Sequence, residues 1–404
     1  MITILKNLNE IVTLSAAHNK DGRNLNPDDL SIIKDGAIVF DEQKILWIGE
    51  TKNLPNEYQA NATSLPGHVL TPEIVDSHTH AIFGGDRASE YVERLNGVSY
   101  EDIAKRGGGI LLTMNQTNAA SSDELYQTAK KRIQTIASYG VGTIEVKSGY
   151  GLNFEKEYEI SLIIARLKKE FAPRVQIINT YMAAHDVPKN FKSSSNYMSE
   201  VVIPLLEKLA PLKIIDAVDI FHEKNYFDDA DTILLFETAK RLGIPGKMHA
   251  DELNDNNGAT LGAKLGSLSC DHLLKISDTG IEAIKNSQTV ATLLPGTAFF
   301  LGKPLAPAKK LLDAGVKVAI ASDYNPGSCH CDNVLLVASI SAAQFKMNIA
   351  QTWCGITLNA AHALGLKNQG ALIVGMSPRL SIFKAESLAH ISYHWGHNFS
   401  VKLT

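Results

Sequence analysis

The sequence predicts an α/β protein built on a (β/α)₈ TIM-type barrel, with a small β-sandwich domain formed from both chain ends. Two observations support the barrel: eight short, apolar, β-branched runs recur along the middle of the chain, and helix-patterned segments lie between most of them. Near-continuous apolar character is typical of strands buried on both faces of a parallel sheet. Strands that alternate with helices in this way favour a barrel.

The eight runs mark the expected strands of the barrel. They are residues 73–76, 141–146, 175–181, 217–221, 244–249, 266–270, 289–294 and 316–322. The clearest helix pattern between them falls in residues 121–140, where Ser122 is expected to cap the first turn and Gly140 follows the last one. Its apolar stripe consists of Leu125, Ala129, Ile133 and Ile136.

The two ends of the chain have a different pattern. Residues 1–66 and 368–404 both hold short strand-like runs separated by turn residues. Neither segment could bury a core alone at this size, so we expect the two to pair in one small β-domain. The expected division is therefore 1–66 for its N-terminal part, 67–367 for the barrel and 368–404 for its C-terminal part.

Composition narrows the class of protein. The chain has 404 residues, 45% of them hydrophobic and 20% charged, and a formal net charge of −4. These values are ordinary for a globular protein and do not favour nucleic acid or an acidic membrane as a partner. No apolar stretch is long enough to span a membrane, and the N-terminus has no basic leader, so we expect a cytoplasmic protein. Four cysteines in a chain of this length do not make a disulfide framework, so free thiols are expected. Cys329 and Cys331 flank His330, and a weak site for a soft metal is the alternative there.

Polar side chains gather where the predicted strands end. The residues at these ends are Asp76, His78, His80, His185, His249, Asp251, Glu252, Asp271, His272 and Asp323. Any one of them alone would most often be structural. Because the active sites of such barrels lie at the carboxyl ends of the strands, their joint placement predicts a reactive centre there.

The histidines and one aspartate match the ligands of a catalytic metal. Zinc and iron take imidazole nitrogen and carboxylate oxygen and leave one position for water. Residues two apart in a strand face the same way, so His78 and His80 can both point into the barrel mouth. His249 and Asp323 would supply the other ligands from across the barrel. A bound metal lowers the pKa of its water to about 7, which provides a hydroxide nucleophile at neutral pH.

Two further residues suit proton transfer and charge stabilisation. Glu252 lies three residues after His249 and could shuttle a proton; the alternative is a carboxylate at a helix N-terminus. His272 could polarise a substrate carbonyl or stabilise an oxyanion; the alternative is a buried histidine with a satisfied hydrogen bond.

Several motifs carry a family resemblance. "DSHTH", "HADE", "SCDH" and "ASDYNPGS" together resemble the mononuclear branch of the amidohydrolase superfamily. "HTHAIFGGDR", "GGGI", "EVKSGYGL", "AAHDVP" and "DYNPGS" resemble, in order and spacing, the imidazolonepropionase family, and the resemblance spans nearly the whole chain. H-x-H alone is only moderately specific, whereas H-x-H-x6-R combined with K-S-G-Y-G-L is highly specific.

The resemblance implies a reaction and assigns residues to it. The fold would be a barrel with a small β-domain, and the reaction would be hydrolysis of 4-imidazolone-5-propanoate to N-formimidoyl-L-glutamate, an enzyme step of histidine degradation. A metal-activated water would attack the ring carbonyl, with Glu252 as acid/base and His272 as the second catalytic residue. One Zn²⁺ or Fe³⁺/Fe²⁺ ion would be held by His78, His80, His249 and Asp323. The implied substrate-binding residues are Arg87, Tyr100, Tyr150, His185, Asn325, Gly327 and Ser328.

The substrate gives the arginine a role. A guanidinium binds a carboxylate in a bidentate way, so Arg87 would hold the propionate tail; the alternative is a plain surface charge. "GGGI" at 107–110 is interpreted as a flexible active-site loop. Related barrels are often dimers, so a homodimer is expected.

Two other functions and three departures stay open. An aminohydrolase acting on another nitrogen heterocycle would release ammonia but would have no particular use for Arg87 together with Tyr150. A non-enzymatic scaffold would have lost metal ligands, yet all four are present. The chain departs from the family at His222, where the family has cysteine, in "SCHCDN" after the strand-eight loop, and in "MSPRLSIFK" near the C-terminal end.

Overall fold

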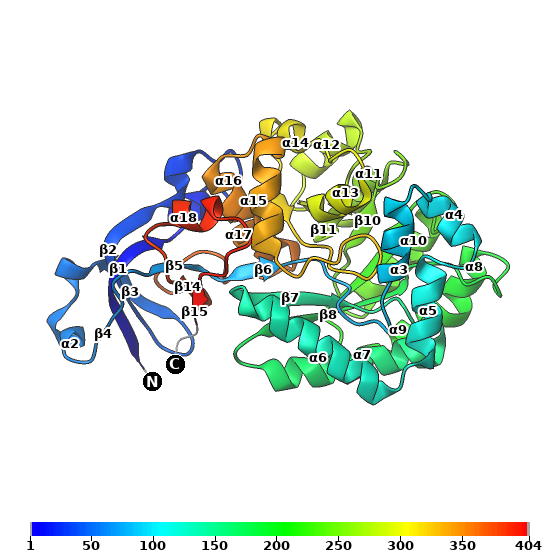
Figure 1. Ribbon diagram of the computed structural model, residues 1–404, viewed down its shortest axis with the longest axis horizontal. Coiled ribbons are helices and arrows are strands. Elements are labelled where there is room, and N and C mark those ends of the chain that lie inside the picture. The colour runs from blue at the N-terminus through cyan, green and yellow to red at the C-terminus, as the bar shows by residue number, and fades with distance from the viewer. Residues whose placement is uncertain (1, 402–404) are drawn as a thin grey trace.

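The computed structural model describes residues 2–401, with the backbone alone for residues 100, 101 and 104. The barrel is an eight-stranded parallel sheet in which the strands are neighbours in chain order, from β6 to β13. Figure 1 labels β6, β7, β8, β10 and β11 among them. Its strands are β6 (Ile74–Asp76), β7 (Val141–Lys147), β8 (Gln176–Ala184), β9 (Ala217–His222), β10 (Met248–Ala250), β11 (Ser269–His272), β12 (Val290–Leu293) and β13 (Val318–Ile320). Each overlaps one of the eight predicted runs, so the predicted barrel is confirmed.

The first and last strands of the barrel meet along a seam. Asp323 N donates to His78 O (3.0 Å), and His80 N donates to Tyr324 O (2.9 Å). The Asp76 carboxylate also accepts from Ser322, from the backbone N at 3.0 Å and from the hydroxyl at 2.6 Å. These bonds nearly close the barrel, and they bring the segment after β6 beside the segment after β13.

Most helices cover the outside of the barrel, whereas the short helix at Asn56–Gln59 lies beside the sheet formed by the chain ends (Figure 1). The helices up to α9 are α1 (Ser15–Asn19), α2 (Asn56–Gln59), α3 (Ala88–Leu95), α4 (Tyr100–Lys105), α5 (Ile110–Ala119), α6 (Ser122–Ser138), α7 (Phe154–Phe171), α8 (Ser194–Tyr197) and α9 (Ile203–Leu209). The later ones are α10 (Asp229–Arg241), α11 (Gly258–Leu265), α12 (Asp278–Lys285), α13 (Pro295–Leu301), α14 (Ala308–Asp313), α15 (Val334–Phe345), α16 (Ile349–Gly355), α17 (Leu358–Ala363) and α18 (Leu388–Tyr393). In Figure 1, α3, α4 and α5 lie on the side of the barrel away from the sheet formed by the chain ends.

The predicted helix at 121–140 forms as α6, with one correction. Its stripe of Leu125, Ala129, Ile133 and Ile136 is buried, as predicted. The cap is Ser121 rather than Ser122, which is the first helical residue. Glu124 decides between the two serines, because its backbone N donates to Ser121 Oγ while its carboxylate accepts from Ser121 N at 2.8 Å. This reciprocal pair is a capping box, and it works only from the residue three positions before the glutamate.

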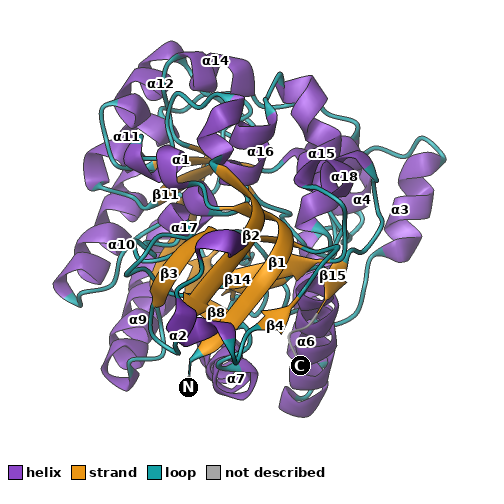
Figure 2. Ribbon diagram, turned by 90° about the vertical axis from the view of Figure 1, so that its left-hand side faces the viewer, coloured by secondary structure: helices purple, strands orange, loops and turns teal. Residues whose placement is uncertain are grey.

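Strands from both chain ends form the second sheet. It holds β1 (Thr3–Val12), β2 (Ile32–Phe40), β3 (Ile45–Glu50), β4 (Thr63–Ser64), β5 (Val69–Pro72), β14 (Leu380–Phe383) and β15 (Ser400–Val401). β14 pairs antiparallel with β5, so that Ile382 lies opposite Leu70, and the sheet faces the viewer in Figure 2. The predicted pairing of the two ends is confirmed, and it takes the form of one seven-stranded sheet.

The end sheet continues directly into the barrel. β5 lies beyond residue 66 and is separated from β6 only by Glu73. The domain limits 1–66, 67–367 and 368–404 therefore stay predictions. Within the described residues, no helix is both long and apolar enough to cross a lipid bilayer. All four cysteines are free thiols.

Candidate active site

The four predicted metal ligands lie together at the mouth of the barrel. His78 and His80 follow β6, and His249 is part of β10. One ring nitrogen from each of the three lies within 4.8 Å of the others. Asp323, just after β13, places Oδ1 3.5 Å from His78 Nε2 and 3.7 Å from His80 Nε2. The seam between β6 and β13 is what brings this carboxylate to the histidines.

The inner atoms of this cluster suit a metal ion. Nε2 of His78 and Nε2 of His249 are buried and have no hydrogen-bond partner among the described residues. Their outer nitrogens are held: His78 Nδ1 lies 2.7 Å from Asp271 Oδ2, and His249 Nδ1 lies 3.1 Å from Asp219 Oδ1. Carboxylates that hold the outer nitrogen and leave the inner one toward a common point are the usual support for a histidine ligand.

The charge state of the cluster also suits a cation. Burial lowers the pKa of His78 and of His80 well below the usual histidine value, and neighbouring positive groups lower both pKa values further. Both rings are therefore neutral, which ligation requires. Burial raises the pKa of the Asp323 carboxyl to about 7, while Thr297 Oγ1 donates to its Oδ2 at 2.6 Å. A metal ion would favour the ionised form of this carboxyl.

A buried network of charges lies beneath the histidines. Lys147 at the end of β7 pairs with Asp219 and with Glu145, and Lys247 donates to Ser77 O (2.7 Å) and to both oxygens of Glu145 (3.0 Å each). All four of these charged side chains are fully buried. Unpaired charges would be costly at this depth, so the network pairs them and orients the carboxylate of Asp219.

Sequence reasoning missed this network. It noted Asp271 at a strand end without a role, and it gave none to Asp219, Glu145, Lys147 or Lys247. A signal was present, since charged residues interrupt the apolar runs "VGTIEVK" and "AVDIF". The partners come from different strands, however, and their pairing depends on the register of the closed barrel.

The two predicted catalytic residues lie beside the cluster. His272, at the end of β11, has its ring centroid 5.1 Å from that of His249, and its Nδ1 lies 3.6 Å from Glu252 Oε1. Burial lowers the pKa of His272 well below the usual value, so its ring is neutral. Burial raises the pKa of Glu252 to about 8, and the negative charges of Asp323 and Glu223 add to the effect. A carboxyl with this pKa can take up and release a proton near neutral pH.

Aromatic rings form one wall of the site. The rings of His80 and His185 are stacked with centroids 4.9 Å apart, and Tyr150 lies 5.1 Å from His185 and 5.7 Å from His80. His185 Nδ1 lies 2.9 Å from Gly149 O. Gly149 has φ +114°, and a Cβ there would lie 2.6 Å from Met182 O, so only glycine fits this turn beside Tyr150.

Arg87 packs against the loop that follows Asp323. Its side chain is buried, and a Cβ added to Gly327 would lie 1.9 Å from its Nη1. Asn325 folds this loop: its Oδ1 accepts from Gly327 N (2.8 Å) and from Ser328 N (2.7 Å), and its Nδ2 donates to Asp323 O (2.7 Å). The predicted contacts of Asn325, Gly327 and Ser328 with substrate stay predictions. The side chain of Tyr100 lies outside the described residues.

Comparison with known proteins agrees with this geometry. The profile of the amidohydrolase family matches residues 69–404. An imidazolonepropionase from Bacillus cereus (strain B4264) is 37% identical over 398 residues, which cover 98% of this chain and 93% of the relative. The chain belongs to the imidazolonepropionase family.

Solved structures with a similar fold include amidohydrolases outside this family. A triazine hydrolase variant superimposes with a TM-score of 0.75 at 12% identity, covering 99% of this chain and 92% of that one. A zinc-bound adenosine deaminase from Xanthomonas campestris gives a TM-score of 0.72 at 15% identity, with coverage of 98% and 90%. At such identities the likeness concerns the fold alone, whereas the imidazolonepropionase match concerns the sequence as well.

The three segments interpreted above as departures lie in different parts of the fold, and "MSPRLSIFK" contains β14 of the end sheet. His222, at the end of β9, places Nε2 2.8 Å from Asp229 Oδ1 and Nδ1 3.4 Å from Asn256 Nδ2. It thereby joins the start of α10 to the loop that follows β10. Among the described residues, only His78, His80 and His249 form a close group of three metal-binding side chains. The side chains of Cys329, His330 and Cys331 do not form such a group in the described part of the chain.

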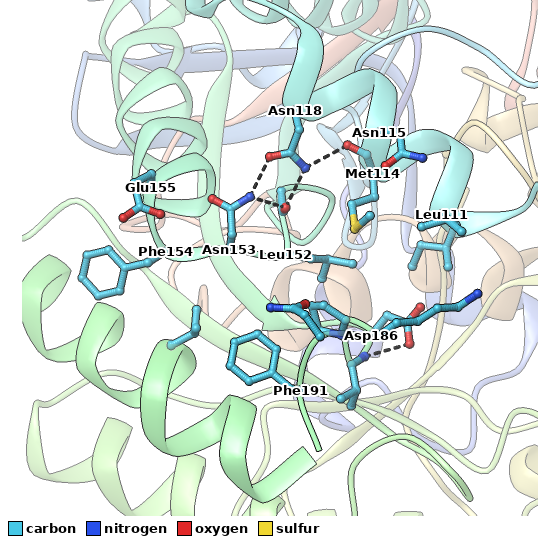
Figure 3. Close-up of a pocket in the computed structure, with 17 residues that line it drawn as sticks. Leu111, Met114, Asn115, Asn118, Leu152, Asn153, Phe154, Glu155, Asp186 and Phe191 are labelled. Atoms are coloured by element: carbon cyan, nitrogen blue, oxygen red, sulfur yellow. Dashed lines mark hydrogen bonds between the residues drawn. The ribbon is translucent and has the colours of Figure 1, made fainter. Parts of the chain in front are cut away.

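A cavity of about 680 Å³ lies beside the site (Figure 3). Its walls are the residues that follow Tyr150 and His185, together with one side of α5 from Ile110 to Asn118 and with Val201. Asn153 Nδ2 donates to Asn118 Oδ1 at 2.6 Å and joins two of these walls. α5 begins at Ile110, so the glycines at 107–109 connect α4 to a wall of the cavity.

Proposed function

We propose that this chain hydrolyses 4-imidazolone-5-propanoate to N-formimidoyl-L-glutamate. The sequence match to imidazolonepropionases supports the class of enzyme. The observation that supports this choice of substrate is the buried guanidinium of Arg87. It packs on the loop that begins at the candidate ligand Asp323. A carboxylate tail on the substrate would bind this buried cation beside that loop, in addition to the carboxylate of Glu90.

We propose that the cofactor is one metal ion, either zinc or iron. His78, His80, His249 and Asp323 would hold it, since their nitrogen and oxygen donors suit both metals. When bound, the ion would polarise the ring carbonyl and lower the pKa of a water molecule to about 7. Asp271 and Asp219 would keep the rings of His78 and His249 in the ligating orientation.

Glu252 and His272 carry the proton chemistry in this proposal. Glu252 accepts a proton from the attacking water and returns it to the ring nitrogen that leaves the carbonyl carbon. Its raised pKa of about 8 supports both directions of transfer. His272 is neutral beside it and can donate a hydrogen bond to the carbonyl oxygen as negative charge develops there.

The remaining residues bind and orient the substrate. Arg87 binds the propionate, and the rings of Tyr150 and His185 form the wall against which the imidazolone ring lies. We assign Tyr100, Asn325, Gly327 and Ser328 to the same pocket on the family resemblance. Holding the carbonyl against the nucleophile lowers the barrier by several kcal/mol, up to about 7–11 in ideal cases.

The partners in this proposal are small. We propose a cytoplasmic enzyme whose only ligands are the substrate and the metal, without nucleic acid or membrane. A homodimer is the proposed assembly. Mass measurement of the purified protein in solution tests the dimer.

Decay of the ultraviolet absorbance of 4-imidazolone-5-propanoate tests the function. The purified, metal-loaded chain should remove the substrate, and removal of the metal with a chelator should stop the reaction until zinc or iron is restored. Release of ammonia from a nitrogen heterocycle, without decay of the imidazolone, would favour the deaminase instead. A chain that binds no metal and turns over neither substrate would support a non-enzymatic scaffold.

A further inference from the structure

The buried Arg87 guanidinium is held by a second buried charge. Arg87 Nε donates to Glu90 Oε2 at 2.7 Å, and each side chain is only 7% exposed. The other carboxylate oxygen, Glu90 Oε1, accepts from Gly109 N at 2.9 Å. Both oxygens of Glu90 are thus engaged, one with the arginine and one with the glycine segment 107–109.

Burial distinguishes this pair from an ordinary helix ion pair. Lys105 and Asp102 have the same i,i+3 spacing, but their side chains are 76% and 59% exposed. Such surface pairs contribute little to stability. A carboxylate buried beside a guanidinium instead restricts the orientation of the cation, because charge-assisted bonds at this depth are strong and directional.

The contact at Nε determines which edge of the guanidinium faces the site. A carboxylate can bind an arginine across Nε and one Nη, or across the two Nη groups. Glu90 occupies the Nε edge, and the Nη end points toward Gly327 in the loop after Asp323. A substrate carboxylate would therefore meet the Nη end of Arg87.

Resting on the function proposed above, we propose that Glu90 is a positioning residue for the substrate carboxylate. It orients Arg87 through Nε and ties that orientation to the segment 107–109. The segment tolerates no side chain at its middle position, because a Cβ on Gly108 would lie 2.7 Å from Glu90 Oε1 and 2.5 Å from Ile103 Cγ2. The three glycines let the backbone come close enough for Gly109 N to bind the carboxylate.

Glu90→Gln is the first variant for the test. It removes the charge and replaces one acceptor oxygen by a donor, so either Arg87 or Gly109 loses its bond. We expect KM for 4-imidazolone-5-propanoate to rise about tenfold or more, the effect of losing a hydrogen bond to a charged group, with kcat changed less. Glu93→Gln is the matched control, since Glu93 is on the same helix and pairs with Arg106 in an exposed position.

A neutral substrate separates positioning from a general structural defect. In the propionamide analogue of the substrate, the tail carries no charge for Arg87 to bind. Glu90→Gln should leave KM for this analogue within about threefold of the wild-type value, because the ion pair it disturbs is absent. An equal rise in KM for the natural substrate and for the propionamide analogue would overturn the proposal. An unchanged KM for the natural substrate would overturn it as well.

Two further variants keep the proposal testable if Glu90→Gln does not fold. Glu90→Asp keeps the charge but withdraws the carboxylate by one methylene, and it should also raise KM for the acid alone. In the Arg87→Gln background, Glu90→Gln should add no further increase in KM, because it acts through the arginine. If KM of the double variant rose by the product of the two single-variant effects, this expectation would be contradicted. If the wild-type protein did not hydrolyse 4-imidazolone-5-propanoate, the proposed function itself would be refuted. This outcome is separate from the comparison of KM between the variants and the wild type, which tests only the role of Glu90.

Discussion

Asp271 and His78 are 193 positions apart in the sequence, yet Asp271 Oδ2 lies 2.7 Å from His78 Nδ1, with both side chains fully buried. The bond fixes the ring so that Nε2 faces Asp323. The aspartate also lies 3.5 Å from Lys247 Nζ, and its proposed effect on metal binding passes through the imidazole of His78.

Asp271→Asn should therefore weaken metal binding without removing a ligand. Loss of a carboxylate partner of a histidine ligand typically costs about 10–100-fold in affinity. Competition with a chelator of known affinity, followed by metal analysis, measures the change. Asp278→Asn is a suitable control, because Asp278 is exposed at the start of α12. Wild-type affinity in Asp271→Asn would contradict the assigned support.

Glu252→Gln should separate metal binding from proton transfer. The amide keeps the size of the side chain but cannot accept the proton, so turnover should fall by at least about 10²-fold. Metal content should stay at the wild-type level, because Glu252 is not among the proposed ligands. Turnover and metal content measured on the same preparation check both parts. Full activity would remove Glu252 from the mechanism.

Gly327→Ala should displace the guanidinium of Arg87. Gly327 does not have a positive φ, so alanine suits the backbone, but its Cβ would lie 1.9 Å from Nη1. The arginine must move, and kcat/KM should fall by about tenfold to a hundredfold, as expected for a displaced binding group. In the control Gly355→Ala, the new Cβ meets no atom closer than 3.5 Å. Equal kinetics in the two variants would show that the position of Arg87 is unimportant.

The stability of the metal-free protein should fall with rising pH because of Glu252. Its folded-state pKa of about 8 lies above the usual 4.5, so the folded protein holds a proton that the unfolded chain releases between these values. The contribution of Glu252 to stability is thus fully present below about pH 4.5 and is lost as the pH rises to about 8.

Unfolding in urea at pH 5 and pH 8.5 measures this dependence. The stability of metal-free Glu252→Gln relative to wild type should be greater at pH 8.5 than at pH 5. Glu237→Gln, an exposed position on α10, serves as the control. A difference between Glu252→Gln and wild type that is the same at both pH values would contradict the assignment.

The sequence was sufficient to predict the barrel and the gathering of its four candidate ligands. Parallel strands buried on both faces leave long apolar runs, and His78, His249 and Asp323 each follow or end such a run. What lies between strands was harder to predict. The bond from Glu90 to Gly109 depends on how α3 and the glycine segment fold back on each other, and neither has a periodic pattern that reveals it.

Two details show what local sequence patterns do not predict. Ser121 and Ser122 are chemically identical as caps, and only the spacing to Glu124 selects the first. Lys147, Lys247 and Glu145 lie on β7 or immediately before β10, and their pairing follows from the register and closure of the barrel. Such long-range pairing is a property of the closed structure that no short stretch of sequence contains.

The seam between β6 and β13 has a consequence for synthesis on the ribosome. His78 and His80 emerge early, but the carboxylate that completes the proposed set comes from Asp323, beside the last strand of the barrel. Because proteins are made from the N-terminus, a nascent chain that ends before this residue has three of the four ligands and an open barrel edge. The chain should therefore acquire its full metal affinity only after nearly the entire barrel has left the exit tunnel. Metal binding would then be a late step in the synthesis of the protein.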